Sequence, residues 1–391
     1  LGLDACPCWV PCSAGCEEAG ARDRLNLDAS CPAAQNCVPG DGLCGQFCAG
    51  TVPGQACAAA TQCIDANGHC DIPTEFVSIA PWAFDGVQSL TSVTIHVGIA
   101  SMGPFAFRGT RLITLTLPDA LAEIPEAAFQ DVSTLTELTF GSGITAVGPD
   151  AFRGCWGVTS LDIPDSITEL GIRAFYGMRG LTSLSIGTGI ETIANECFRA
   201  CGTTNGIASL TIPGTVSSIL GYAFADLGNE ATPTTLTIET GVGILDNGAF
   251  SASTVTDVYI PGSVTQIRYA AFALCPLITT VTIASGVQTI RDEAFKNTGL
   301  GTGKVVVLPE TVTSCSATAF PSWVPVCGGA SSLGLDACPS CAAFSTTFPT
   351  TPAGYSVEAV TATTVNGLGA VACASGYHGT AVVECLDDGG E

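Results

Sequence analysis

The strongest pattern in the chain is the return of an Ala-Phe dipeptide every 22 to 26 residues. The phenylalanines of this series are Phe84, Phe107, Phe129, Phe152, Phe175, Phe224, Phe250, Phe272, Phe295 and Phe320, and Cys197-Phe198 fills the remaining place. Apolar and polar residues alternate ahead of each return, as in Leu181-Thr-Ser-Leu-Ser-Ile186. Such alternation predicts a half-buried β-strand. A regular return at this length predicts a solenoid with one rung per repeat.

A single rung of this repeat is too small to bury its own apolar side chains. Stacking solves the problem, because each rung covers the apolar edge of its neighbour. We therefore expect the phenylalanines to form one column in the core, with the small alanine letting the backbone pass close by. About ten to eleven rungs at ~4.8 Å spacing predict a body roughly 50 Å long. The predicted fold is a β-rich solenoid flanked by small disulfide-rich modules.

The repeat is most complete between residues 144 and 164. It reads Ile144-Thr-Ala-Val147, Ala151-Phe152-Arg-Gly-Cys155 and Leu161-Asp-Ile163-Pro164. This pattern resembles the BspA-type leucine-rich repeat over about residues 77–327. The resemblance implies a leucine-rich-repeat solenoid on a cell surface, with roles in adhesion or in binding host and matrix proteins, and it brings no catalytic residues. Longer rungs at Gly202–Gly206 and Gly228–Pro233 depart from the pattern and predict loops, as decoration or as contact sites.

Three domains are predicted. Residues 1–76 are a cysteine-rich, disulfide-stapled segment with the N-terminal cap, 77–327 are the solenoid with its C-terminal cap, and 328–391 are a linker and a cysteine module. The heptapeptide Leu1–Pro7 returns unchanged as Leu333–Pro339, which favours a longer protein in which solenoids and cysteine-rich segments alternate. The stretch 369–389 is similar to the second half of a sushi (complement-control) module, and the chain stops before that module would close.

Cysteine is abundant, with 21 residues in all. Eleven of them fall within the first 70 positions, densely and at irregular spacing, which is typical of a disulfide scaffold in an oxidising compartment. We therefore expect an extracellular or cell-surface protein. Zinc at Cys12-x3-Cys16 or Cys44-x3-Cys48 is the alternative, but His69 is the one histidine nearby. Cys315 and Cys327 bracket the last rung and are candidates for a capping disulfide.

Three other cysteines, Cys155, Cys201 and Cys275, share one place in the repeat, three residues after the phenylalanine. Since other rungs have Val, Met or Leu at this place, we expect buried apolar side chains rather than ligands. Cys197 lies four residues before Cys201, a spacing that allows a small local bridge.

Composition narrows the range of partners. The chain has 12 Lys and Arg against 35 Asp and Glu, a net charge of −23. This charge excludes a nucleic acid or an anionic membrane as the natural partner, because both need a basic surface. No stretch approaches the 18 apolar residues of a membrane span. His69, His96 and His378 lie far apart and no hydrolase, metalloprotease or nucleotide motif appears, so we predict no enzyme, cofactor or metal site.

The outward positions of the predicted strands form two columns rich in Ser and Thr. The first column is Ser92, Thr114, Glu137, Ser160, Ser183, Ser209, Thr235, Asp257 and Thr280. The second is Thr94, Thr116, Thr139, Asp162, Ser185, Thr211, Thr237, Tyr259 and Thr282. Glu137, Asp162, Asp257 and Tyr259 interrupt the hydroxyl pattern and are the predicted contacts on a concave sheet. Regular Thr columns also suggest ice binding as a minor alternative, which these four interruptions argue against.

These features predict an extracellular structural or adhesive module, one link of a tandem-modular surface or filament protein. Its partners would be other copies of itself or other matrix and surface proteins, with glycans also open. The alternative is a ligand-recognition ectodomain that uses the Thr/Ser-rich sheet. Regular contacts between copies would favour the first interpretation, and a monomer with one distinctive polar patch would favour the second.

Overall fold

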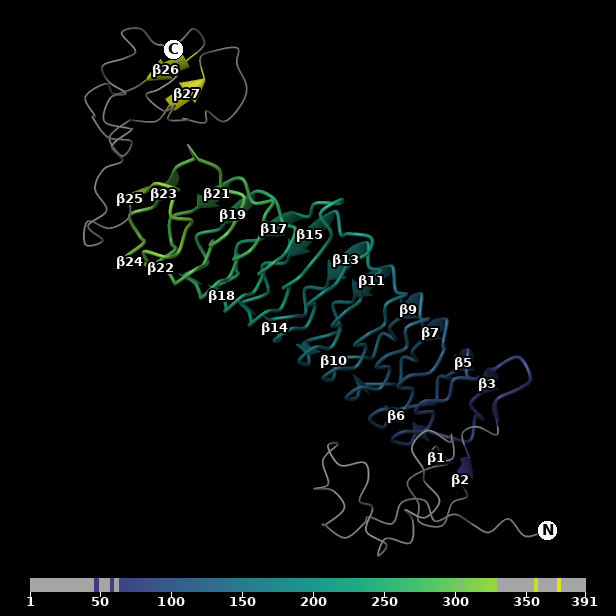
Figure 1. The fold of residues 1–391 in the computed structure, drawn as a ribbon. Helices are drawn as coiled ribbons and strands as arrows, with labels where there is room; N and C mark the ends of the chain where they lie inside the picture. The colour runs from purple at the N-terminus through teal and green to yellow at the C-terminus, as the bar shows by residue number, and fades with distance from the viewer. Residues whose placement is uncertain are drawn as a thin grey trace, which may run out of the picture.

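The structure is a computed structural model that describes residues 63–302 and 304–328, together with the backbone of four short strands outside this range. Residues 63–328 form an elongated stack of rungs with the N-terminal and C-terminal rungs at opposite ends (Figure 1). The stack has about 11 turns, so the predicted β-solenoid is confirmed.

Each rung contributes one strand to each of two rows, which lie on different sides of the body (Figure 1). The first row consists of β3 (His69–Asp71), β5 (Ser92–Thr94), β7 (Thr114–Thr116), β9 (Glu137–Thr139), β11 (Ser160–Ile163), β13 (Ser183–Ile186), β15 (Ser209–Ile212), β17 (Thr235–Ile238), β19 (Val258–Ile260), β21 (Val281–Ile283), β23 (Val306–Leu308) and β25 (Val326–Gly328). The second row consists of β4 (Ser78–Ile79), β6 (Ser101–Met102), β8 (Glu123–Ile124), β10 (Ala146–Val147), β12 (Glu169–Leu170), β14 (Thr192–Ile193), β16 (Ser218–Ile219), β18 (Ile244–Leu245), β20 (Gln266–Ile267), β22 (Thr289–Ile290) and β24 (Ser314–Cys315). The strands outside residues 63–328 are β1 (Gln46–Cys48), β2 (Cys57–Ala59), β26 (Tyr355–Val357) and β27 (Val371–Cys373).

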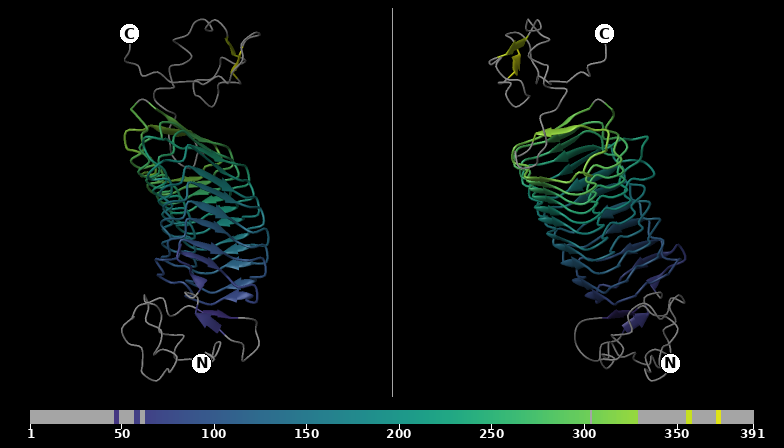
Figure 2. Two further views of the ribbon diagram at one scale, coloured as in Figure 1. Left: turned by 90° about the vertical axis from the view of Figure 1, so that its right-hand side faces the viewer. Right: turned by 60° about the vertical axis from the view of Figure 1, so that its left-hand side comes forward.

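Neighbouring rungs pair in parallel with like residues opposite each other. Where β11 pairs with β13, Leu161 lies opposite Leu184 and Ile163 opposite Ile186. Successive side chains of a strand point to opposite faces, so the Leu and Ile are buried while the Ser and Asp between them are exposed. Figure 2 shows the first-row strands stacked as arrows along one side of the body. The alternation of apolar and polar residues in the sequence therefore corresponds to buried and exposed side chains of the first row.

The N-terminal edge of the second row has an antiparallel neighbour. Strand β1 pairs antiparallel with both β2 and β4, and Phe47 lies opposite Ile79. An antiparallel strand ends the parallel stack and covers backbone groups that a bare edge would leave open to other chains. In the first rung, a disulfide joins Cys63 to Cys70 of β3.

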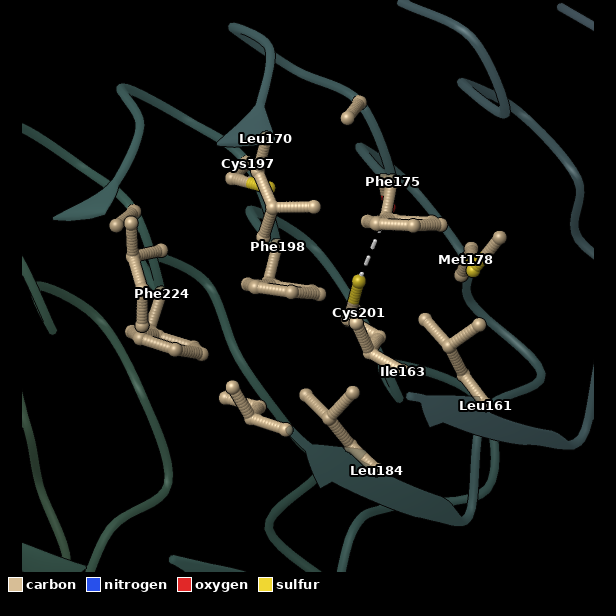
Figure 3. Close-up of a cluster of buried hydrophobic side chains, with 14 of the residues drawn as sticks. Leu161, Ile163, Leu170, Phe175, Met178, Leu184, Cys197, Phe198, Cys201 and Phe224 are labelled. Carbon is tan, nitrogen blue, oxygen red and sulfur yellow. Dashed lines mark hydrogen bonds between the residues drawn. The ribbon is translucent and has the colours of Figure 1, made fainter. Parts of the chain in front are cut away.

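The phenylalanines stack face to face as one column through the core, as predicted. The ring centroids of Phe152 and Phe175 are 5.6 Å apart and those of Phe175 and Phe198 are 5.5 Å apart, with interplanar angles of 2° and 5°. The column phenylalanines from Phe84 to Phe295 are all 0% exposed. Figure 3 shows three of these rings with the Leu and Ile side chains of the first row packed against them.

The backbone around each column phenylalanine forms a third stacked wall. For the column phenylalanines from Phe84 to Phe295, the residues two before and two after have positive φ, as in Asp150 (54°) and Gly154 (76°) around Phe152. The amide N–H groups of these three residues donate to carbonyls of the next rung at 2.8–2.9 Å. Left-handed backbone is unfavourable for residues other than glycine. It recurs here because every rung is held by its neighbours in the same conformation.

The cysteines at the shared repeat position are buried, as predicted, and also have a polar role. The thiols of Cys155, Cys201 and Cys275 donate to the carbonyl oxygen of the phenylalanine one rung earlier at 3.3, 3.2 and 3.1 Å. Figure 3 shows the bond from Cys201 to Phe175. Burial raises the pKa of Cys201 to about 12 and that of Cys275 to about 11, so both thiols stay neutral donors.

Two predicted disulfides are not formed. Cys197 and Cys201 are both free, because Cys197 occupies the alanine place before Phe198 while Cys201 reaches back to the preceding rung. Cys315 is also a free thiol, so the predicted capping bridge to Cys327 is absent. The two residues belong to different rows, since Cys315 is in β24 and Cys327 is in β25. The zinc motifs, the sushi-like stretch and the Leu333–Pro339 repeat lie outside the described residues.

Candidate functional site

The candidate site is the outward side of the first row from β5 to β21, which we call the strand face. Paired residues such as Thr116 and Thr139, or Thr211 and Thr237, lie opposite each other in register. The outward residues of both columns are exposed, apart from the half-buried Ser92. The strand face is therefore a surface of short polar side chains on stacked strands that are hydrogen-bonded in parallel pairs.

Hydroxyl groups at the start of the strands tie each rung to the one before it. Thr136 donates through Oγ1 to the carbonyl of Ile113 at 3.0 Å, and Thr182 donates to that of Thr159 at 2.9 Å. Thr91 makes the same kind of bond to Gly68. These bonds fix the edge of the strand face, so a partner would meet a surface that loses little conformational freedom on binding.

The structure divides the four predicted contact residues into two pairs. Glu137 in β9 and Asp162 in β11 lie in successive rungs, and both are exposed. Asp257 and Tyr259 lie at β19, with β13, β15 and β17 between the two pairs. The four residues therefore do not form one site.

The two pairs also differ in how free their polar groups are. The carboxylate of Asp257 accepts hydrogen bonds from Thr279 (3.0 Å) and Thr280 (2.6 Å) of the next rung. Tyr259 is 56% exposed opposite Thr282. Among the described residues, no ion pair involves Glu137 or Asp162. The pair in β9 and β11 is thus the part of the strand face with unsatisfied charge.

A polar cluster marks the N-terminal end of the strand face. His69 of β3 has Nδ1 at 2.7 Å from Ser92 Oγ and Nε2 at 3.0 Å from Asp71 Oδ1, and Thr94 is 3.2 Å from the same Nε2. Hydrogen bonds from Thr94 and His69 lower the pKa of Asp71. The order Ser, His, Asp matches a hydrolase triad, but the Asp71 side chain is 78% exposed, whereas a triad needs a buried carboxylate. The cluster completes the hydrogen bonding of the first two strands.

Carboxylates also close the turns that follow the strands. Asp119 accepts from the backbone N–H and the hydroxyl of Ser142 at 2.7 and 3.0 Å, and Asp165 does the same with Thr188 at 2.6 and 2.9 Å. The hydrogen bond from the backbone N–H is the main cause of the lowered pKa of both carboxyl groups. These acids connect successive rungs.

The two loops of the longer rungs lie next to each other. Asn229 donates from Nδ2 to the carbonyl of Thr204 at 2.8 Å, and Asn205 donates to that of Gly180 at 2.9 Å. The extra residues of one rung are thus held against those of the next. This arrangement gives the solenoid a local ridge of exposed polar residues, including Thr204, Asn205 and Glu230.

A further cluster lies beside the phenylalanine turns and was not predicted. It consists of Arg153, Trp156, Tyr176 and Arg179, and we call it the turn-side cluster. The Arg153 guanidinium lies over the Tyr176 ring at 5.5 Å, and that of Arg179 lies over the Trp156 ring at 5.2 Å. Each pair joins two successive rungs. One feature of the sequence could have predicted the turn-side cluster: all four residues stand one or four places after a column phenylalanine.

No set of three or more His, Cys, Asp or Glu in the described part of the chain is arranged to hold a metal ion. The same residues include no helix that is long and apolar enough to cross a membrane.

A parallel stack of Leu-rich strands with one phenylalanine turn per rung defines a leucine-rich-repeat protein. The family described as BspA type leucine rich repeat region matches the chain at residues 62–179, 146–227 and 203–323. These stretches together span more than half of the chain, and the protein belongs to this family. The resemblance read from the sequence is thus confirmed for the solenoid.

Solved structures of similar proteins share 18–20% sequence identity with the chain. A leucine-rich repeat protein from Bacteroides ovatus is 20% identical, covering 66% of this chain and 82% of that one with a TM-score of 0.48. A leucine rich cell surface protein from Faecalibacterium prausnitzii is 20% identical, with coverages of 74% and 88% and a TM-score of 0.41. The pneumococcal vaccine antigen PcpA is 18% identical, with coverages of 63% and 58% and a TM-score of 0.40. No curated protein matches the chain in sequence.

Proposed function

We propose that the chain is an extracellular adhesion and recognition module that binds protein partners through the strand face. The observation that carries this proposal is the strand face itself, a rigid, in-register polar surface with the unpaired carboxylates of Glu137 and Asp162. Short Ser and Thr side chains let another protein approach the sheet closely. The two carboxylates supply charge that selects among partners.

The size of the strand face sets a condition on the partner. Nine strands at ~4.8 Å span about 38 Å, and four residues per strand span about 13 Å, which gives roughly 500 Å². A stable interface buries about 800 Å² on each partner. A tight partner therefore extends beyond the strand face, and the ridge at Thr204, Asn205 and Glu230 is an adjoining polar surface.

An extracellular location agrees with the cysteine chemistry. The Cys63–Cys70 disulfide requires an oxidising compartment to persist. The thiols of Cys155, Cys197, Cys201 and Cys275 are fully buried, which protects them there from oxidation. The proposal includes the division into residues 1–76, 77–327 and 328–391, with the solenoid as one link of a tandem structural or adhesive protein.

The test measures binding of the purified chain to a panel of immobilised extracellular matrix and cell-surface proteins. For any partner found, the double variant Glu137→Ala with Asp162→Ala should weaken binding about tenfold or more, because it removes the unpaired charge from the strand face. The matched control is Glu123→Ala with Glu169→Ala, which removes two exposed carboxylates from the second row.

Binding that survives the strand-face variant and falls with the control would contradict the proposal, as would a panel without any partner. The ice-binding alternative finds no support in the strand face, because Glu137, Asp162 and Tyr259 are exposed among the hydroxyls. Freezing-point hysteresis caused by the intact chain would instead support ice binding.

A further inference from the structure

Most of the positive charge between residues 63 and 328 lies close in sequence to the phenylalanine turns. Between residues 63 and 328 there are ten Lys and Arg, and nine of them lie within four residues of a column phenylalanine. These nine are Arg108, Arg111, Arg153, Arg173, Arg179, Arg199, Arg268, Arg291 and Lys296. The strand face contains none of them. The basic side chains of the solenoid are therefore found near the turns, among nearby carboxylates, and not on the strand face.

Four of these cations, Arg108, Arg173, Arg199 and Arg268, are paired with carboxylates of neighbouring rungs. Arg108 pairs with Asp85, and Arg268 pairs with Asp246 at 3.1 Å. Arg173 donates two hydrogen bonds of 3.0 Å to Asp150. These pairs stabilise the turn side and leave little charge for a partner.

Among the described residues, Arg111, Arg179 and Arg291 make no ion pair, and of these three only Arg179 belongs to the turn-side cluster. No ion pair among the described residues involves Arg179, and Arg153 has only a 3.6 Å contact with Asp150, which Arg173 already holds through two hydrogen bonds. Trp156 beside them is 50% exposed. Trp, Tyr and Arg are the residues that most often dominate the energy of protein interfaces. The cluster combines unpaired positive charge with exposed aromatic surface.

The net charge of −23 determines what such a cluster can meet. Two copies of this chain repel each other over most of their surfaces, so they can approach only where one copy presents an excess of arginine. The complementary surface is the unpaired acidic pair of the strand face. Glu137 belongs to the same rung as Arg153, and Asp162 belongs to the next rung, together with Arg179.

We propose that copies of the chain associate side by side, with the turn-side cluster of one copy docked on Glu137 and Asp162 of the next. This inference rests on the proposed function of the strand face and names a second copy as its partner. With solenoid axes parallel and rungs level, both arginine–carboxylate contacts form at once because donors and acceptors occupy the same two rungs. The contact joins two different surfaces, so it adds copies head to tail, as an open row or as a closed ring.

Sedimentation velocity of the intact chain over a wide concentration range at physiological ionic strength tests the proposal. The wild-type chain should form a concentration-dependent series of species. The turn-side variant Arg153→Glu with Arg179→Glu should raise the dissociation constant about tenfold or more, and so should the strand-face variant Glu137→Arg with Asp162→Arg. The control Arg111→Glu with Arg291→Glu makes the same change of charge at two exposed arginines without ion pairs and should leave association unchanged.

Charge exchange supplies the decisive measurement. A 1:1 mixture of the turn-side and strand-face variants should associate again, because the acidic turns of one variant meet the basic strand face of the other. This rescue also shows that both variants are folded. A wild-type chain that stays monomeric at every concentration, reversals without effect, or a mixture without rescue would each overturn the side-by-side contact. Binding to matrix proteins is measured separately, so the proposed function stands or falls on its own assay.

Discussion

Truncation of a phenylalanine in the middle of the column tests whether the stack carries the stability of the solenoid. Phe175 is 0% exposed, lies between the rings of Phe152 and Phe198, and has the edge of Phe140 at 6.5 Å. Phe→Ala changes in protein cores cost about 3–5 kcal/mol. The substitution removes the stacked partner of both Phe152 and Phe198. We therefore expect Phe175→Ala to lower the free energy of unfolding by about 4 kcal/mol.

The assay is urea unfolding followed by circular dichroism and by tryptophan fluorescence. With a slope of about 3 kcal/mol/M, a loss of 4 kcal/mol lowers the unfolding midpoint by roughly 1.3 M. Phe320→Ala is the matched control, because Phe320 ends the described column and stacks on Phe295 alone at 5.0 Å. We expect about half the loss there, since one stacked face is removed instead of two.

A loss at Phe175 below about 1 kcal/mol, the range of surface substitutions, would refute the stacked-column argument. Equal losses of stability for Phe175→Ala and Phe320→Ala would refute the expectation that the loss depends on the number of stacked neighbours. If the weakened rung divides the solenoid into two cooperative units, the two probes should give different midpoints, as expected for a nearest-neighbour stack.

Three further predictions follow from the packing and the hydrogen bonds. Ala174→Leu should cost about 1–3 kcal/mol by overpacking, because Ala174 is 0% exposed, and urea unfolding measures this loss. Cys201 and Cys275 should resist a thiol reagent at pH 8 in the folded chain and react once urea unfolds it. Peptide mass spectrometry measures the labelling of each cysteine. Labelling of either thiol in the native state would contradict its burial and raised pKa. Asp119 and Asp165 have a lowered pKa, so they stabilise the fold above their unfolded pKa of about 3.9, and this contribution disappears as the pH falls through the folded pKa. The melting temperature of Asp119→Asn with Asp165→Asn should therefore lie below that of the wild type at pH 7, and the difference should disappear as the pH falls through the lowered pKa of the folded carboxyl groups. A difference that does not change with pH would exclude this linkage.

The disulfide predictions show where sequence reasoning failed. Cys315 and Cys327 are close in the sequence and bracket one rung, which made a bridge plausible. A rung runs around the whole body, however, so residues twelve positions apart end in different rows. Sequence spacing gives no measure of distance across a solenoid unless the position of each residue within the rung is known.

The role of the four predicted contact residues stays a prediction. Outward exposure of Glu137, Asp162, Asp257 and Tyr259 followed from strand alternation and is present in the structure. Their division into two separate pairs became clear only in the structure, because the number of stacked rungs between two residues decides their separation. The hydrogen bonds that occupy Asp257 also depend on Thr279 and Thr280 of the next rung.

The sequence by itself determined the repeat, the phenylalanine column and the two outward columns of the strand face. Each of these depends on local periodicity, and the periods of 2 and of about 23 residues are written directly in the chain. The tertiary structure decided which charges stay free. Arg173 and Arg179 look alike in the sequence, but Asp150 lies one rung before Arg173 and neutralises it, while Arg179 lies over Trp156. The free charge of a solenoid surface depends on contacts between rungs, and only the stacked structure shows them.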